Sequence, residues 1–171
     1  HNAEANLEPD LSSTMKYQRD NNLHFLHYFL HFLFLGVIQL VMYNRDTNKK
    51  KFMKQAMVGE LVFLAVWSIM LDFNWQATLL VFILLTVLVR FAMMSGNWAQ
   101  HAFIDASQPE NSYLNSITCI KTVYNKKCFN DGYHICHHLK PHMHWTDMPK
   151  DFQKNIDKYI AHKSIVFEGI D

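Results

Sequence analysis

Residues 75–94 read WQATLLVFILLTVLVRFAMM, an apolar stretch of twenty residues with one charge, at Arg90. Between positions 79 and 89 only Thr86 interrupts the apolar side chains. Twenty residues of α-helix rise about 30 Å, which matches the hydrocarbon core of a bilayer. The stretch therefore predicts a transmembrane helix, and the alternative is a buried helical hairpin in a soluble protein.

A second apolar stretch, residues 56–71, precedes it and reads AMVGELVFLAVWSIML. It has sixteen residues and includes Glu60, so it is shorter and less apolar than the first. The tripeptide Asp-Phe-Asn at positions 72–74 separates the two stretches. Helices satisfy their own backbone hydrogen bonds inside a bilayer, so we expect a transmembrane hairpin over residues 56–94 with a tight turn on its far side.

A third apolar stretch, residues 23–43, reads LHFLHYFLHFLFLGVIQLVMY and carries no full charge. It is long enough to span a bilayer. However, His24, His27 and His31 recur at helical spacing and fall on one face. A helix with a polar stripe on one side suits the membrane interface, so this segment has two possible placements.

Residues 44–55, NRDTNKKKFMKQ, form a strongly basic segment between these apolar stretches. Positive charge next to membrane segments is typical of the cytoplasmic side. We therefore expect a cytoplasmic loop here.

Composition excludes several classes of protein. The 171 residues hold 16 Lys and Arg against 15 Asp and Glu, which argues against a nucleic-acid binder because such proteins need a basic surface. Three cysteines do not make a disulfide framework in a chain of this length, and they are expected to be reduced. The length suits one domain or part of a larger one.

The sequence 133–138, Tyr-His-Ile-Cys-His-His, contains an HxxHH pattern. On a helix, His134, His137 and His138 fall on one face. Neutral imidazole is a good ligand for iron, zinc, copper and nickel. We interpret the pattern as a metal site, and a chance occurrence in a chain with 11 histidines is the alternative.

A second polar pattern, Asn97-Trp-Ala-Gln-His101, directly follows the long apolar stretch. Its Asn and His are four residues apart and lie one above the other if the helix continues. The pattern predicts a carboxamide and an imidazole at the membrane surface. His1 cannot be judged from spacing, because nothing precedes it.

These motifs together resemble the integral-membrane fatty acid desaturase and hydroxylase superfamily. Residues 130–149 are similar to the last histidine box of that superfamily, with its HHLxP and W-x-x-x-P tail. Residues 97–101 are similar to its NxxxH element, and His1 to the end of its middle histidine box. The resemblance covers most of the chain.

The resemblance implies a membrane enzyme with two iron ions that uses O₂ as a co-substrate. The implied ligands are His134, His137, His138 and His101, with His1 as a further candidate and Asn97 acting through a water molecule. The family's first box, and most of its second, do not occur in this sequence. We therefore expect a C-terminal fragment that does not assemble the full site alone and is inactive by itself.

Metal-bound imidazoles usually donate their other ring nitrogen to a carboxylate or carbonyl. Asp131 is close in sequence to His134, and Asp105 is close to His101. We expect these two carboxylates to accept hydrogen bonds from the ring nitrogens of His134 and His101 that do not bind the metal ion. No further catalytic residue is predicted.

The positions of the histidine motifs constrain the membrane topology. If residues 56–94 cross twice, both of their ends lie on one side, together with the basic segment. His1 must share that side to reach the same centre. Residues 23–43 then cannot cross once, so we expect them to lie in the interface or to enter and return, bending at Gly36.

The predicted fold is therefore all-α, an integral-membrane helical hairpin with a cytosolic, His-rich helical cap. One partial domain, residues 1–171, is expected to contain the apolar or interfacial segment 23–43, the hairpin 56–94, the cap 95–150, and a C-terminal helix and tail at 151–171.

The predicted function is a membrane-bound, O₂-dependent desaturase that introduces a double bond into a fatty acyl chain. A hydroxylase or ketolase of the same superfamily is the nearest alternative. A zinc-dependent membrane hydrolase would need a nearby general base that the sequence does not show. A haem-binding or metal-handling membrane protein would place its histidines on facing membrane helices, whereas the clearest cluster here lies outside the apolar stretches.

The resemblance also implies partners and a location. We expect a lipid or acyl substrate and an external electron donor, either cytochrome b5 or a ferredoxin. The membrane is expected to be the endoplasmic reticulum or a plastid membrane, with the histidine motifs on the cytosolic or stromal side.

Overall fold

The computed structural model describes residues 6–169, which form two compact units. A helical unit comprises Phe25–Ser95, and a cap unit combines the residues up to His24 with those from Gly96 onward. The chain is 61% helix and 4% strand, which confirms the all-α prediction.

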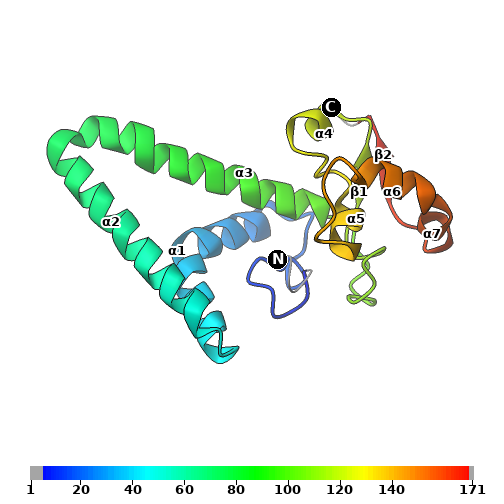
Figure 1. Cartoon of the computed structure of the whole chain (residues 1–171), viewed down its shortest axis with the longest axis horizontal. Coiled ribbons are helices and arrows are strands. Elements are labelled where there is room, and N and C mark those ends of the chain that lie inside the picture. Colours follow the sequence, from blue (N-terminus) through cyan, green and yellow to red (C-terminus); the bar gives the residue numbers. More distant parts are fainter. Residues whose placement is uncertain (1–5, 170–171) are drawn as a thin grey trace. The chain divides into compact units, whose positions relative to one another are not determined.

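The helical unit begins with α1 (Asn22–Asp46) and continues with α2 (Lys50–Thr78) (Figure 1). Only residues 47–49 lie between these helices. Asn48 adopts φ 57°, a left-handed conformation that Asn tolerates, and the Lys49 amide donates to the Asn44 carbonyl at 2.7 Å. The prediction of a loop over residues 44–55 was therefore wrong, because both helices extend into the basic segment.

Helix α1 runs through Gly36 without a break and has 25 residues. The bend that we expected at this glycine is therefore not present. At 1.5 Å per residue the helix is about 38 Å long, which is sufficient to span a bilayer. Its placement in the interface stays a prediction.

The break predicted at residues 72–74 is confirmed. Asn74 has φ −159° and ψ 93°, which are not helical, and its side-chain oxygen accepts the Ala77 amide at 3.0 Å. This bond caps the helix that follows. The chain turns sharply here and continues through η1 (Leu79–Leu84), a short π-helix, into α3 (Leu85–Gln100) (Figure 1).

Most large apolar side chains of the helical unit are exposed. In the most apolar 18-residue stretch of α1, 11% of the residues are buried. The same fraction is buried in the most apolar stretch of the helical segment Lys50–Gln100. A core helix of a soluble protein would be mostly buried. Both helices are long and apolar enough to cross a membrane, which supports the prediction of a membrane protein.

Helices α1 and α3 contact each other inside this unit. The ring of Phe91 packs edge to face against Phe25 and Phe29, with centroid distances of 5.7 and 5.2 Å. Arg90 donates from Nη1 to the carbonyl of Leu33 at 3.3 Å. The single charge of α3 is thus directed to a backbone acceptor of α1.

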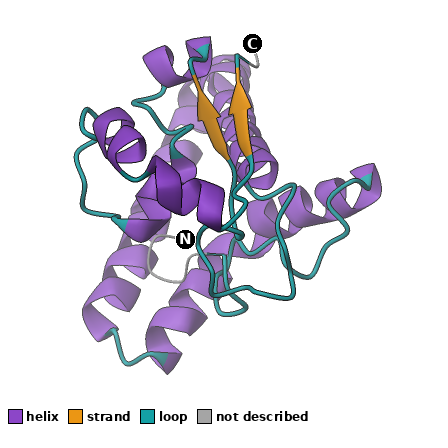
Figure 2. Ribbon diagram, turned by 90° about the vertical axis from the view of Figure 1, so that its right-hand side faces the viewer, coloured by secondary structure: helices purple, strands orange, loops and turns teal. Residues whose placement is uncertain are grey.

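The cap unit contains short elements. They are β1 (Thr118–Ile120), α4 (Val123–Lys127), α5 (His134–Leu139), α6 (Met148–Lys154), α7 (Ile156–Ala161) and β2 (Val166–Glu168). The two strands pair in parallel, with Thr118 opposite Val166 (Figure 2). This pair was not predicted, because each strand has only three residues. Ile135, Phe152 and Tyr159 form the apolar core.

The segment that precedes α1 belongs to the cap unit. Asn6 is fully buried, and its side-chain amide donates to the Asn115 side-chain oxygen at 3.1 Å. Trp98 donates from its indole nitrogen to the Arg19 carbonyl at 3.0 Å. The start of α1 and the end of α3 therefore lie in the same unit.

Candidate metal centre

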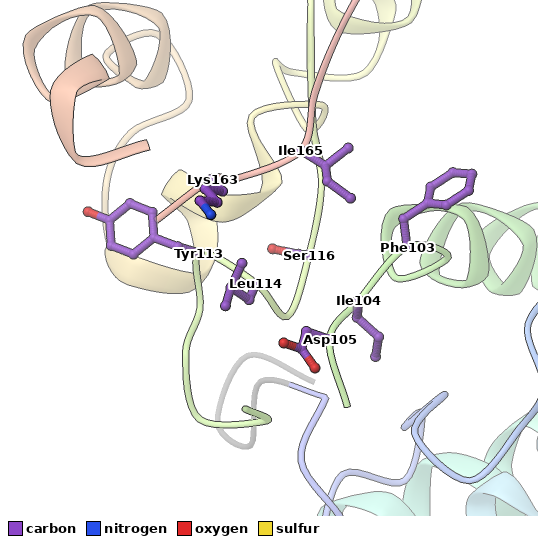
Figure 3. Close-up of a pocket in the computed structure, with 8 residues that line it drawn as sticks. All are labelled: Phe103, Ile104, Asp105, Tyr113, Leu114, Ser116, Lys163 and Ile165. Carbon is purple, nitrogen blue, oxygen red and sulfur yellow. The ribbon is translucent and has the colours of Figure 1, made fainter. Parts of the chain in front are cut away.

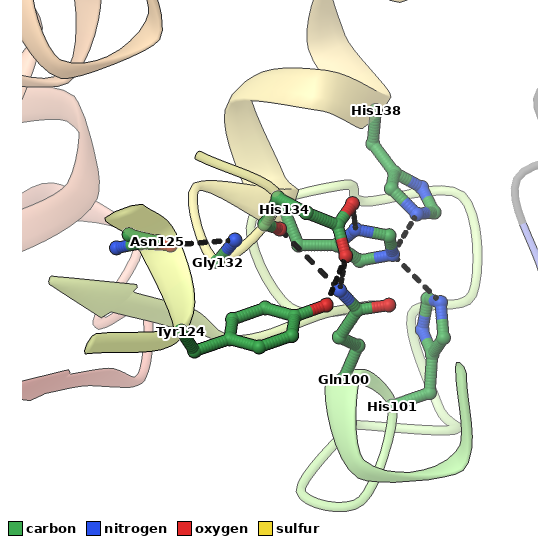
Figure 4. A network of polar contacts seen from close by, with 8 residues as sticks. Gln100, His101, Tyr124, Asn125, Gly132, His134 and His138 are labelled. Atoms are coloured by element: carbon green, nitrogen blue, oxygen red, sulfur yellow. Dashed lines mark hydrogen bonds and ion pairs between the residues drawn. The ribbon is translucent and has the colours of Figure 1, made fainter. Parts of the chain in front are cut away.

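Three histidine rings meet in the cap unit, next to the end of α3 (Figure 4). His134 Nε2 lies 3.3 Å from His101 Nε2 and 3.1 Å from His138 Nε2. One ligand nitrogen from each ring falls within 4.8 Å of the others. The structure thus brings His101 together with two members of the HxxHH pattern, 33 residues further along the chain.

Helix α5 presents these rings because its other face is needed for the core. Ile135 and Cys136 are fully buried, and Ile135 belongs to the apolar cluster with Phe152. Residues four apart on a helix differ by about 40° around its axis, so His134 and His138 point the same way.

His137 lies outside the group of three ligands. Its ring stacks beside that of His134 with a centroid distance of 5.7 Å. Three residues of helix rotate the side chain by about 300°, which places His137 on the opposite flank of His134 from His138. Of the three ligands expected on α5, His134 and His138 therefore meet His101, whereas His137 does not join them.

The orientation of His101 is set by a backbone carbonyl. Its Nδ1 contacts the Asn115 oxygen at 2.5 Å, and because a carbonyl only accepts, Nδ1 carries the hydrogen. The Nε2 lone pair is then directed at the other two rings. Asp105, which we expected in this role, is exposed and accepts instead from the Ser107 amide and hydroxyl. The chain turns away between His101 and Asp105, so the carboxylate does not reach the ring.

Asp131 lies beside His134, where the sequence predicts it. Its Oδ1 is 4.0 Å from His134 Nδ1, an ion-pair distance that exceeds a direct hydrogen bond. Its Oδ2 accepts from Gln100 Nε2 and from the Tyr124 hydroxyl, each at 2.6 Å. Neither Gln100 nor Tyr124 was identified from the sequence, although Gln100 is a polar residue adjacent to His101 at the end of an apolar helix.

Burial controls the protonation of the three rings. It lowers the pKa of His101 to about 4, with a smaller opposing effect from the Asn115 carbonyl. Burial and then the neighbouring rings lower the pKa of His138 to about 3 and that of His134 well below its usual value. All three imidazoles are therefore neutral at pH 7, the form that binds a metal ion.

The other two predicted ligands are Asn97 and His1. Asn97 donates from its side-chain amide to the Ser12 carbonyl at 2.9 Å, which ties α3 to the segment before α1. The structure thus gives Asn97 a direct protein contact, and its expected contact with a metal ion through water stays a prediction. His1 lies outside the described residues.

A cavity of about 160 Å³ opens elsewhere in the cap unit (Figure 3). Its lining includes Phe103, Tyr113, Leu114 and Ile165, with the charged residues Asp105 and Lys163. None of the three clustered histidines lines it. The cavity is smaller than typical sites for drug-sized molecules.

Comparison with known proteins agrees with the motifs and the geometry. A family model described as fatty acid desaturase matches residues 1–168. No curated protein and no solved structure matches the chain. The match includes the apolar helices and all of the clustered histidines. The chain therefore belongs to the fatty acid desaturase family.

Proposed function

We propose that this chain is part of a membrane-bound lipid desaturase and contributes ligands to a two-iron centre. Family membership supports an oxidoreductase of the desaturase and hydroxylase type that acts on lipid in a membrane. The observation that carries the proposal is the convergence of three neutral imidazoles, two of them buried and that of His138 half-buried, at the end of an apolar helix.

The residues fit a metal ion by their chemistry and spacing. Imidazole nitrogens bound to one ion at about 2.1 Å are roughly 3.0–3.4 Å apart at octahedral or tetrahedral angles. The two separations that involve His134 Nε2, 3.1 and 3.3 Å, fall in this range, and all three ligand nitrogens lie within 4.8 Å of one another. His101, His134 and His138 would hold one iron ion. His137 and His1 are further proposed ligands of the centre, with Asn97 acting through water.

Two iron ions together with O₂ supply an oxidant strong enough to attack an unactivated C–H bond. The protein's own contribution is to hold the ligand rings in fixed orientations and to keep water away from them. The Asn115 carbonyl fixes the tautomer of His101, and Asp131 provides a negative charge beside the ring of His134. The complete burial of His101 limits access of solvent.

Desaturation is our first choice, and hydroxylation is the second, because the same centre supports both outcomes. A zinc hydrolase is less well supported, since it needs a general base and no carboxylate joins the three imidazoles among the described residues. Asp131 is engaged by Gln100 and Tyr124 rather than directed at the ligand nitrogens.

We further propose an external one-electron donor, cytochrome b5 or a ferredoxin, and a cytosolic or stromal location for the centre.

The proposal is tested by expressing the protein from its complete reading frame in a yeast strain that lacks its own desaturase. We expect two iron ions per chain by elemental analysis and a new unsaturated fatty acid in the lipids. His134→Ala should abolish both, whereas His142→Ala, at an exposed position, should abolish neither.

Other outcomes would change the assignment. A hydroxylated product with the same iron content would favour the alternative reaction. Stoichiometric zinc in place of iron would overturn the two-iron proposal.

A further inference from the structure

The loop that leads into α5 is held by a side chain of α4. Asn125 donates from Nδ2 to the Cys119 carbonyl at 2.7 Å and accepts the Gly132 amide at 2.9 Å (Figure 4). Helix α4 is itself capped by the Thr122 hydroxyl, which accepts the Asn125 amide at 3.1 Å. The backbone that directly follows Asp131 is therefore held by α4 independently of the Asp131 carboxylate.

The carboxylate of Asp131 is oriented by two further donors. Tyr124, the neighbour of Asn125 in α4, donates its hydroxyl to Oδ2 at 2.6 Å. Gln100 donates to the same oxygen at 2.6 Å and to the Asp131 backbone carbonyl at 3.3 Å. With Oδ2 occupied in this way, Oδ1 is left facing the Nδ1 edge of His134.

Gln100 is well placed to link the two segments that carry ligands. It is the residue before His101, and its backbone carbonyl accepts the Ile117 amide at 2.9 Å. Its side chain reaches the segment that carries His134, so a shift of one ligand segment must be transmitted to the other. Hydrogen bonds with a charged acceptor are stronger than neutral ones, which makes this link stiff.

We propose that Gln100 and Tyr124 are positioning residues, which hold the Asp131 carboxylate against His134 and fix the spacing between His134 and His101. The inference rests on the proposed metal centre and adds to it the groups that set its geometry. In other metal sites, mutation of the residues that hold a metal ligand in place lowers the affinity for the metal by about 10-fold to 100-fold.

The test uses Tyr124→Phe and Gln100→Leu in the full-length protein, with Tyr113→Phe and Gln108→Leu as matched controls. Tyr113 lies in the same unit and loses the same hydroxyl, although it is half-buried whereas Tyr124 is exposed, and Gln108 is exposed. The dissociation constant for Fe(II) is measured by competition with a chelator. We expect it to rise about 10-fold for Tyr124→Phe and more for Gln100→Leu, with little change in the controls.

A double-mutant cycle separates positioning from general stability. In an Asp131→Ala background, Tyr124→Phe should have no additional effect on Fe(II) affinity, because its influence passes through the carboxylate. Equal effects in both backgrounds would overturn the proposal.

A second readout does not require metal. In protein labelled with ¹⁵N-histidine, the ring nitrogen shifts of His134 report whether Nδ1 carries a hydrogen that faces Asp131. We expect Tyr124→Phe and Gln100→Leu to alter these shifts and the controls to leave them unchanged.

The outcomes distinguish the two proposals. If the wild-type protein binds no iron, the two-iron function fails, and the ring nitrogen shifts still decide whether Gln100 and Tyr124 are positioning residues. If iron binds and neither readout changes, only the positioning roles fail.

Discussion

The side-chain amide of Asn97 donates to the backbone carbonyl of Ser12, 85 residues earlier in the chain, at 2.9 Å. Ser12 precedes α1 and Asn97 lies in the last turn of α3. The chain therefore leaves the cap unit at α1 and returns to it at α3. If the cap unit lies on one side of a membrane, the chain between these residues must cross an even number of times. This contact supports the same conclusion that the histidine motifs suggested, and it does so without His1.

Labelling of single cysteines can determine which helix does not cross. We expect a cysteine at position 48 to react from the side of the cap, and one at position 74 to react from the opposite side. The reason is that the basic residues around Asn48 favour the cytoplasmic side. An impermeant maleimide applied to sealed vesicles provides the measurement. Reaction of both positions 48 and 74 from the opposite side would show instead that α1 crosses and α2 lies in the interface.

The stability of the metal-free protein should fall as the pH decreases below about 6.5. Between that value and about pH 4, the unfolded chain binds a proton at His101 and the folded chain does not. The free energy of unfolding should therefore decrease over this window, by roughly 3 kcal/mol for His101 alone. Urea unfolding at several pH values measures the slope. His101→Gln should flatten it, whereas His162→Gln, at an exposed position, should not.

Gly132→Ala should disrupt the contacts by which Asn125 holds the loop that leads into α5. A Cβ atom at this position would lie 2.3 Å from the Asn125 side-chain oxygen and 2.8 Å from the Cys119 carbonyl. Overpacking of this kind typically costs about 1–3 kcal/mol. Thermal unfolding and Fe(II) affinity should both report the loss. Gly96→Ala is the matched control, because no atom lies within 4 Å of its added Cβ. Equal behaviour of the two variants would contradict the structure.

Cys136 should resist alkylation in the folded protein. Its side chain is fully buried, and burial, followed by the nearby Asp151 carboxylate, raises the pKa of the thiol to about 12. At pH 8 almost none of it is in the reactive thiolate form. Mass spectrometry after brief maleimide treatment should find Cys128 modified and Cys136 unmodified until denaturant is added. Modification of both at similar rates would show that the core face of α5 is open.

Local patterns in the sequence predicted the features that depend on local geometry. The apolar stretches predicted the long helices, and Asn74 breaks the second run where polar residues interrupt it. His134 and His138 point the same way because they are four residues apart on one helix. Asp131 was identified because it is close in sequence to His134.

Features that depend on the path of a loop could not be predicted in this way. The group that orients His101 is the Asn115 carbonyl, and every residue has a carbonyl, so no residue type marks it. Asp105 is nearer in sequence, but the loop directs it to solvent. Gln100 becomes significant only once the segment containing Asp131 has been placed beside α3. The HxxHH spacing likewise could not distinguish His137 from the two residues that meet His101.

The cap unit is assembled from two parts of the chain that are separated by the helical unit. During synthesis, the segment containing Asn6 and Ser12 emerges from the ribosome before the helical unit, when Asn115 and Asn97 are not yet available as partners. It must wait until the apolar helices have been made and delivered to the bilayer. Strand β2 is needed last, because β1 has no pairing partner among the described residues until Val166–Glu168 has been synthesised. Membrane insertion must therefore precede closure of the cap.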